Sequence, residues 1–213
     1  MSERAGEGGE RPARRFLRLA LSRASRGSGS PANFYNRRTS VQPIPNLSGV
    51  LDPLRWALIG GIALRAYAPE RMTLDVDIVI HERDAPAARQ AFIAANYRII
   101  AELAIGGFSA REPCPDAMPV DVIARKDPWL EDALSAPCRD RAGHPVLARP
   151  YLTLLKLQAG RTQDLADVQR LLATTPAAER ASTRNLIERH TPDLVEDYDA
   201  LITLADLEFG DDG

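Results

Sequence analysis

The spacing of apolar residues changes once along the chain and divides it into two parts. Between about residue 50 and residue 124, short runs of apolar or alternating residues are bounded by Gly, Pro and Asp, which is typical of β-strands. Strands are predicted at residues 54–59, 73–81, 97–103, 107–111 and 120–124. Helices are predicted at residues 62–68 and 84–96, the second with Asp84 as its N-cap. The pattern indicates a sheet that is complete by residue 124, with helices beside it.

From Pro150 onward, apolar residues recur at the three- and four-residue spacing of helices. Pro150 is well placed at the start of the first of these helices, since proline is favoured in a first turn. Further helices are predicted at residues 164–173, 177–190 and 192–209. The predicted fold class is therefore α+β: a mixed sheet flanked by helices, followed by a C-terminal helical lobe.

The first 49 residues show neither pattern. They are rich in Gly, Ser, Pro and Arg, and this composition predicts disorder. Residues 1–50 contain nine Arg and three Glu, so this arm carries the positive charge of a chain whose net charge is -2. The predicted organisation is a disordered basic arm at 1–49, an α/β core at 50–149 and a helical lobe at 150–209.

Composition limits the classes of protein that fit. A chain of 213 residues with 45% hydrophobic side chains supports one ordinary core with an accessory piece. The net charge of -2 argues against a protein that coats nucleic acid. Cys114 and Cys138 lack a CxxC spacing or a histidine cluster, which favours free thiols. No run approaches the roughly 18 apolar residues of a membrane span, so we expect a cytoplasmic protein with no membrane partner.

Gly60 and Gly61 separate a predicted strand from a predicted helix. Backbone N–H groups at the start of a helix point toward an anion, and glycine allows a phosphate to approach the backbone closely. The arrangement is typical of a phosphate-binding turn. A tight connection between a strand and a helix, without any ligand, also explains it.

Three acidic residues interrupt apolar strands. Asp75 and Asp77 are two residues apart, so their side chains project from one face of a strand about 6.6 Å apart. Their repulsion is about 2.5 kcal/mol at an effective dielectric constant near 20. Mg²⁺ or Mn²⁺ would relieve it, and a nearby Asp121 would allow two metal ions to clamp a phosphoryl transfer. The alternatives are a solvent-facing polar stripe and an ordinary exposed Asp121.

Two separated runs carry a longer motif. The first is Leu58-Ile59-Gly60-Gly61-Ile62-Ala63-Leu64-Arg65-Ala66-Tyr67 with Arg71-Met72-Thr73-Leu74-Asp75-Val76-Asp77-Ile78, and the second is Lys156-x-x-Ala159-x-Arg161-x-x-Asp164-x-x-Asp167. Together they resemble the nucleotidyltransferase superfamily of the polymerase-beta type, in particular its AbiEii-like and related bacterial branches. The resemblance covers residues 56–172. Many members have Gly-Ser at the turn, where this chain has Gly61.

The resemblance implies a role for each residue of the motif. Gly60 and Gly61 would contact a triphosphate, Asp75 and Asp77 would bind Mg²⁺ or Mn²⁺, and Asp121 would complete the metal site and help deprotonate an acceptor hydroxyl. Further nucleotide-binding residues would be Arg71, Thr73, Lys156, Asp164 and Asp167. Lys156 is alternatively an exposed surface lysine, and Asp164 and Asp167 are alternatively surface partners of Arg161 and Arg170 at i,i+3 spacing.

The predicted function is that of a Mg²⁺-dependent nucleotidyltransferase. It would move a nucleoside monophosphate from an NTP to an acceptor hydroxyl and release pyrophosphate. Some relatives are toxins that modify tRNA ends, so tRNA is a candidate acceptor, and an antitoxin is a candidate partner in a toxin-antitoxin pair. A catalytically silent nucleotide-binding or antitoxin-like module is the first alternative. The second is a protein that binds RNA through its basic arm.

Overall fold

The chain folds into two compact units, which are described separately. A computed structural model describes residues 11–26, 44–68 and 73–210. One unit, the sheet unit, lies within residues 31–153. The other, the helical unit, combines residues from the first 30 positions with those from 154 onward. The sequence places the corresponding boundary at residue 150, and helix α7 (Arg149–Ala159) spans both positions.

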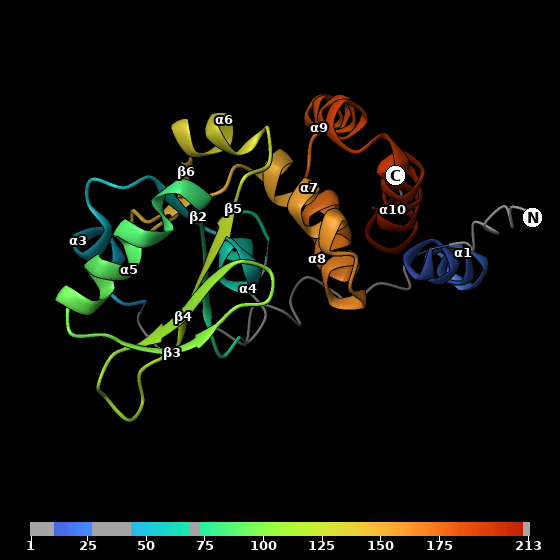
Figure 1. Cartoon of the computed structure of the whole chain (residues 1–213). Coiled ribbons are helices and arrows are strands. Elements are labelled where there is room, and N and C mark those ends of the chain that lie inside the picture. The colour runs from blue at the N-terminus through green and yellow to red at the C-terminus, as the bar shows by residue number, and fades with distance from the viewer. Residues whose placement is uncertain (1–10, 27–43, 69–72, 211–213) are drawn as a thin grey trace, which may run out of the picture. The chain divides into compact units, whose positions relative to one another are not determined.

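The sheet unit is built on a seven-stranded mixed sheet (Figure 1). Its strand order is β3-β4-β5-β2-β1-β7-β6. The β2–β5 and β1–β7 pairs are parallel, and the other neighbours are antiparallel. The strands are β1 (Trp56–Leu58), β2 (Val76–His81), β3 (Arg98–Glu102), β4 (Gly107–Arg111), β5 (Val120–Arg125), β6 (Cys138–Arg139) and β7 (Pro145–Val146). The predicted α+β class with a mixed sheet is confirmed.

One face of the sheet is apolar and is covered by helix α5 (Ala85–Ala94). Phe92 of this helix packs edge-on against Phe108 of β4, with ring centroids 5.6 Å apart. Phe108 lies opposite Val122 of β5, and both side chains are buried. Because side chains alternate along a strand, Asp121 must project from the other face. The alternation thus separates an apolar core face from a face that carries polar groups.

Short helical segments complete the sheet unit. They are α3 (Leu47–Leu51), α4 (Gly60–Ala63), η1 (Leu64–Ala66), η2 (Glu82–Asp84) and α6 (Leu130–Ser135). Asp84 stands at the N-cap position of α5 but makes no side-chain capping bond. The side chain of His81 instead accepts a hydrogen bond from the Arg83 N–H, at the start of η2.

The prediction that the sheet is complete by residue 124 is wrong. Strands β6 and β7 extend it beyond β1, on the side away from β5. Each has only two residues, and β7 begins with Pro145. Segments this short show no alternation, and proline is a signal against a strand. Their presence follows from pairing with Leu58, which is opposite Val146 in the sheet.

The helical unit contains α1 (Pro12–Arg23), α8 (Thr162–Ala173), α9 (Ala177–His190), η3 (Pro192–Leu194) and α10 (Val195–Phe209). Helix α10 packs against α1, α8 and α9. Tyr198 is fully buried there and donates a hydrogen bond to the Arg180 carbonyl over 3.1 Å. Burial raises the pKa of the Tyr198 hydroxyl to about 12, so it stays protonated as a donor. The helices predicted after residue 160 are confirmed.

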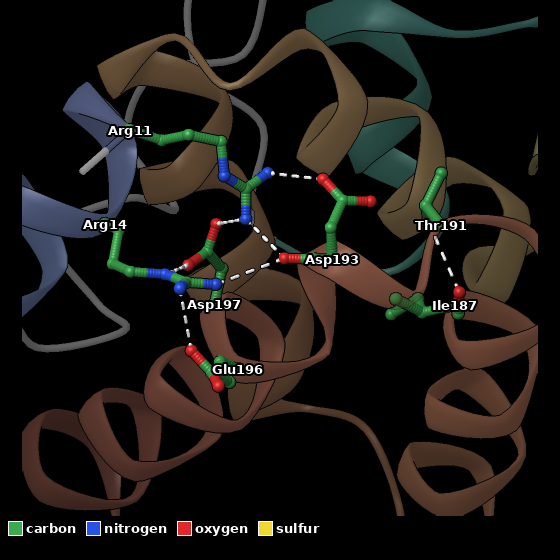
Figure 2. A network of polar contacts seen from close by, with 7 residues as sticks. All are labelled: Arg11, Arg14, Ile187, Thr191, Asp193, Glu196 and Asp197. Atoms are coloured by element: carbon green, nitrogen blue, oxygen red, sulfur yellow. Dashed lines mark hydrogen bonds and ion pairs between the residues drawn. The ribbon is translucent and has the colours of Figure 1, made fainter. Parts of the chain in front are cut away.

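The prediction of a disordered arm at 1–49 is wrong for two segments. Residues 12–23 form α1, and residues 47–51 form α3. Figure 2 shows Arg11 and Arg14 beside η3 and the first turn of α10, where they form ion pairs with Asp193, Glu196 and Asp197. The acidic first turn of α10 thus neutralises basic residues at the start of α1. Residues 1–10 and 27–43 of the arm lie outside the described residues.

No helix in the described ranges has both the length and the apolar character needed to cross a bilayer.

Candidate metal and nucleotide site

The turn after β1 depends on glycine at position 60. Gly60 has a φ of +65°, a conformation that L side chains adopt only at a cost. A Cβ atom at this position would lie 1.8 Å from Oδ2 of Asp77, far inside contact distance. The neighbouring Ile59 N–H donates to the Asp77 carbonyl over 2.9 Å. Gly60 is therefore required both by its backbone and by the carboxylate next to it.

The helix predicted at 62–68 begins and ends two residues earlier and is α-helical only in its first four residues. It starts at Gly60 as the four-residue α4 and continues as the 3-10 turn η1. Gly61 is buried within α4. The backbone of the turn thus approaches the Asp77 carboxylate directly, without a side chain in between.

The three acidic residues of the sequence motif come together at one end of the sheet. Asp77 of β2 and Asp121 of β5 lie directly opposite each other in the parallel register. Asp75 falls within the strand predicted at 73–81 but precedes the first residue of β2, so it lies just outside the observed strand. Carboxylate oxygens of Asp75, Asp77 and Asp121 all lie within 4.8 Å of one another, and each residue is partly exposed. We call these three residues the carboxylate triad.

The triad fits a divalent cation. Mg²⁺ takes oxygen ligands at about 2.0–2.1 Å, so two oxygens on opposite sides of one ion are separated by about 4.2 Å. In the structure the carboxylate oxygens are separated by up to 4.8 Å. Small side-chain rotations would bring them to the separation that one ion requires. Partial exposure leaves room for water and phosphate oxygens, which usually complete a Mg²⁺ shell. The oxygen-only donor set suits Mg²⁺ or Mn²⁺ and does not distinguish them.

A threonine holds one member of the triad. The Thr73 hydroxyl donates to Oδ1 of Asp75 over 2.6 Å, and Thr73 itself is buried. The bond fixes the Asp75 carboxylate without neutralising its charge. Thr73 therefore contacts a member of the triad, and its predicted role in nucleotide binding stays a prediction. Arg71 lies outside the described residues.

Two contacts in the sheet unit were not found from the sequence. Ser109 of β4 is buried and lies directly opposite Asp121, so it shares the triad's face of the sheet. Arg65 of η1 forms an ion pair with Asp140, with Nε to Oδ2 at 2.9 Å. The first depends on strand pairing and the second on long-range packing, neither of which the sequence pattern specifies. The Asp140-Arg141-Ala142-Gly143 run is typical of a turn, and this was the one sequence feature that could have indicated a structural role for Asp140.

Asp140 fixes the chain that follows the glycine turn. Its Oδ1 accepts hydrogen bonds from the N–H groups of Ala142 and His144, both over 2.9 Å. Burial acts to raise the pKa of Asp140, but the hydrogen bond from Arg65, the N–H of His144 and the Arg65 charge outweigh it and lower that pKa. The carboxylate therefore stays charged and anchors η1 to the β6–β7 turn.

The second sequence motif forms a separate cluster in the helical unit. Lys156 Nζ lies 2.7 Å from Oδ2 of Asp167 and 3.5 Å from Oδ1 of Asp164. Arg161 and Arg170 form the predicted i,i+3 ion pairs with Asp164 and Asp167. Lys156 is only 4% exposed and Asp167 is fully buried, so the alternatives of a surface lysine and of surface acidic residues are wrong. We call Lys156, Asp164 and Asp167 the buried ion cluster.

Among known proteins, the chain shows similarity only to solved structures. No protein-family model matches the chain, and no curated protein matches it. Three solved structures show a related arrangement. The solution structure of the antibiotic-resistance factor ANT(2'')-Ia has a TM-score of 0.49 and 13% identity, covering 72% of this chain and 93% of that one.

The other two structures are more distant. The crystal structure of ANT(2")-Ia with adenylyl-2"-tobramycin has a TM-score of 0.43 and 16% identity, covering 74% of this chain and 92% of that one. An antigenic nucleotidyltransferase-like protein from Paracoccidioides brasiliensis has a TM-score of 0.41 and 14% identity, covering 72% and 89%. All three TM-scores lie below 0.5 and all three identities below 25%, so these similarities assign neither a family nor the AbiEii-like branch to the chain. The functional proposal rests on the triad.

Proposed function

We propose that this protein is a divalent-metal-dependent nucleotidyltransferase. It moves a nucleoside monophosphate from an NTP to a hydroxyl group of an acceptor. The observation that carries the proposal is the carboxylate triad, whose oxygens lie within 4.8 Å of one another beside the Gly60 turn. A chain gains nothing in stability by placing three carboxylates together, whereas phosphoryl transfer requires such a set to hold metal ions.

Each residue has a distinct part in the proposed reaction. Asp75 and Asp77 would hold the cation, and Thr73 fixes the orientation of Asp75. Bound there, Mg²⁺ or Mn²⁺ would neutralise the charge of the phosphates. The turn at Gly60 and Gly61 lets the triphosphate approach the backbone. Asp121 accepts the proton of the acceptor hydroxyl as well as serving as a metal ligand.

The bond changes follow from these positions. The acceptor oxygen forms a bond to the α-phosphorus, the bond from that phosphorus to the bridging oxygen of the β-phosphate breaks, and pyrophosphate leaves. The hydroxyl proton passes to Asp121 or to water. The protein contributes positioning and charge, and it forms no covalent intermediate.

The finer assignments rest on the sequence resemblance alone. Nucleotide binding by Arg71, Lys156, Asp164 and Asp167 stays a prediction, and the mutual ion pairs of the last three support a structural role at least. A tRNA acceptor and an antitoxin partner likewise stay predictions. Adding purified tRNA with labelled NTP and looking for label on the RNA tests the acceptor directly.

Calorimetric titration of the four NTPs, with and without Mg²⁺, tests the proposal. We expect wild type to bind at least one NTP only with Mg²⁺, and Asp75→Asn/Asp77→Asn to lose that binding. Asp116→Asn removes the charge of an exposed acid that follows β4 and should bind normally. Equal metal-dependent binding by the double variant would refute the site. Binding without pyrophosphate release from any acceptor would support the silent nucleotide-binding module instead.

A further inference from the structure

An arginine pair lies on the same face of the sheet as the carboxylate triad. The register places Asp77, Asp121 and Ser109 in one row across β2, β5 and β4. Arg111 follows Ser109 by two residues on β4, so it projects from the same face. Arg98 of β3 lies directly opposite Arg111. The two arginines therefore stand at the edge of the triad's face, on the side of β5.

This pair is unfavourable for the fold by itself. Like charges directly opposite each other on antiparallel strands destabilise a sheet. Both side chains are exposed, and among the described residues no carboxylate lies within ion-pair distance of either one. Glu112, the nearest acid in sequence to Arg111, accepts a hydrogen bond from the Tyr97 hydroxyl over 2.6 Å. The chain thus leaves two adjacent guanidinium groups available to an external anion.

The same arginines line a concavity. Its volume is about 390 Å³, and Ile100 and the segment from Glu112 to Pro115 complete its lining. A bulge in β3 between Ile99 and Ala101 leaves Ile100 without a partner in the ladder, and Ile100 is half exposed. Bulges re-aim side chains and are common next to active sites. The hollow combines the two arginines with a partly apolar wall, and its one acidic residue, Glu112, is hydrogen-bonded to Tyr97.

The order of the strands indicates which substrate of the proposed reaction this hollow would bind. Gly60 follows β1, on one side of β2, whereas the arginines lie beyond β5, on the other side. With strands about 4.8 Å apart and about 3.3 Å per residue, the Cα atom of Arg111 is about 8 Å from that of Asp121. The triad therefore separates the turn proposed for the NTP phosphates from the arginine pair. The group that the pair binds belongs to the acceptor.

We propose that Arg98 and Arg111 bind a phosphate group of the acceptor. This inference rests on the proposed nucleotidyl transfer, since it assigns the second substrate of the same site. Guanidinium groups form paired hydrogen bonds with phosphate, and two of them side by side suit a phosphate better than a neutral group. The pair also disfavours a polycationic acceptor. A phosphorylated small molecule and an RNA strand share this chemistry.

The test compares two double variants. Arg98→Ala/Arg111→Ala removes the pair, and Arg139→Ala/Arg141→Ala removes the same charge from β6 and its turn, at the opposite edge of the sheet. The probes are a single-stranded RNA oligonucleotide with a free 3'-hydroxyl, followed by fluorescence anisotropy, and ribose 5-phosphate, followed by calorimetry. Unphosphorylated ribose is the control ligand.

We expect wild type to bind at least one phosphorylated probe and not ribose. Arg98→Ala/Arg111→Ala should weaken that binding at least about tenfold, and Arg139→Ala/Arg141→Ala less than twofold. If RNA is the ligand, loss of this one phosphate contact should also reduce the slope of log K against log salt concentration by about 0.7. Binding of RNA alone identifies a nucleic-acid acceptor, and binding of ribose 5-phosphate identifies a small one.

Three results would overturn the inference: no binding of either probe by wild type, unchanged binding by Arg98→Ala/Arg111→Ala, or equal losses in both double variants. Thermal unfolding checks that the first variant is folded, and removal of the repulsion should leave its Tm unchanged or higher. Mg²⁺-dependent NTP binding should persist in both variants. If Asp75→Asn/Asp77→Asn keeps that NTP binding, the proposed function fails, whatever the arginine variants show.

Discussion

The two acidic clusters of this chain are made from the same residue type but differ in burial and in the contacts that the carboxylates make. In the buried ion cluster, Asp164 and Asp167 are buried and both lie close to Lys156. In the carboxylate triad, Asp75 and Asp121 are partly exposed, and Asp75 is held by a neutral hydroxyl. Acids whose charge is matched by their own chain belong to the fold. Three partly exposed carboxylates whose oxygens lie within 4.8 Å of one another suit a divalent cation.

The physical cost explains the difference. Burying a carboxylate requires a cationic partner, because the effective desolvation penalty is several kcal/mol per ion. The helical unit supplies Lys156 from α7, Arg161 at the N-cap of α8 and Arg170 within α8. The triad avoids the full penalty by remaining partly in water. Substitutions should therefore affect stability in the first cluster and ligand binding in the second.

Loss of Lys156 should have the largest effect on stability. Lys156→Met leaves Asp167 buried without its closest cation, and we expect the free energy of unfolding to fall by about 3–5 kcal/mol. Lys126→Met is the matched control, because Lys126 is 79% exposed and should change stability by less than about 1 kcal/mol. Urea denaturation measures both. Similar small changes in the two variants would show that the buried cluster does not stabilise the fold.

Gly60→Ala should cause the second-largest loss in the free energy of unfolding. It places a Cβ atom against the Asp77 carboxylate and forces a non-glycine residue to a φ of +65°. The backbone cost of about 1–2 kcal/mol and an overpacking cost of about 1–3 kcal/mol predict a loss of about 2–4 kcal/mol.

Gly143→Ala separates these two contributions. Gly143 has a φ of +87°, but no atom lies within 4 Å of an added Cβ, so only the backbone cost applies. Thermal unfolding, with Mg²⁺-dependent NTP binding as a second measurement, compares the variants. Equal losses would mean that the contact with Asp77 is unimportant.

The two clusters also differ in how far the sequence predicts them. The spacing of Asp75 and Asp77 and the apolar run around Asp121 were enough to predict the triad, because side-chain alternation is local. Adjacency of Asp121 to Asp77 needed the parallel β2–β5 pairing, which the structure provides. The i,i+3 pairs at Arg161 and Arg170 were equally local and were predicted. Their burial depends on packing between helices, which sequence spacing does not specify.

The same limit explains the elements that were missed. Strands β6 and β7 are too short for a periodic signal and exist because β1 offers a free edge. Helix α1 has a basic sequence with one buried residue, Leu17, and its ion pairs with Asp193 and Asp197 link positions about 180 residues apart. Composition predicts disorder for such a segment when its partner is distant in sequence. Local chemistry was predictable, and long-range pairing was not.

Asp140 tests whether a buried carboxylate with a cationic partner also stabilises the fold outside the helical unit. Its carboxylate is buried and paired with Arg65 in the sheet unit, so Asp140→Asn should cost about 1.5–3 kcal/mol at pH 7. Its pKa is lowered on folding, so this stabilisation is present above the unfolded pKa of about 3.9 and is lost as pH falls through the folded pKa.

Urea denaturation from pH 7 to pH 3 measures the effect. The free energy of unfolding of wild type should fall more steeply at the acidic end than that of Asp140→Asn. Asp132→Asn, at an exposed position of α6, should keep the steep dependence of wild type. Parallel curves for wild type and Asp140→Asn would contradict the role given to the Arg65 contact.

The smallest effect, and the only one of opposite sign, is expected in the triad. Asp121→Asn removes one of three neighbouring charges at a partly exposed position, so without divalent ions stability should rise by about 1 kcal/mol. Added Mg²⁺ should stabilise wild type more than the variant, because a ligand at free concentration L that binds only the folded state stabilises it by RT ln(1 + L/Kd), and the variant should have the higher Kd. Asp116→Asn should follow wild type in both conditions. Thermal unfolding with EDTA or Mg²⁺ gives both numbers, and a loss of stability in Asp121→Asn without metal would place the triad, like the buried ion cluster, among the contacts that hold the fold together.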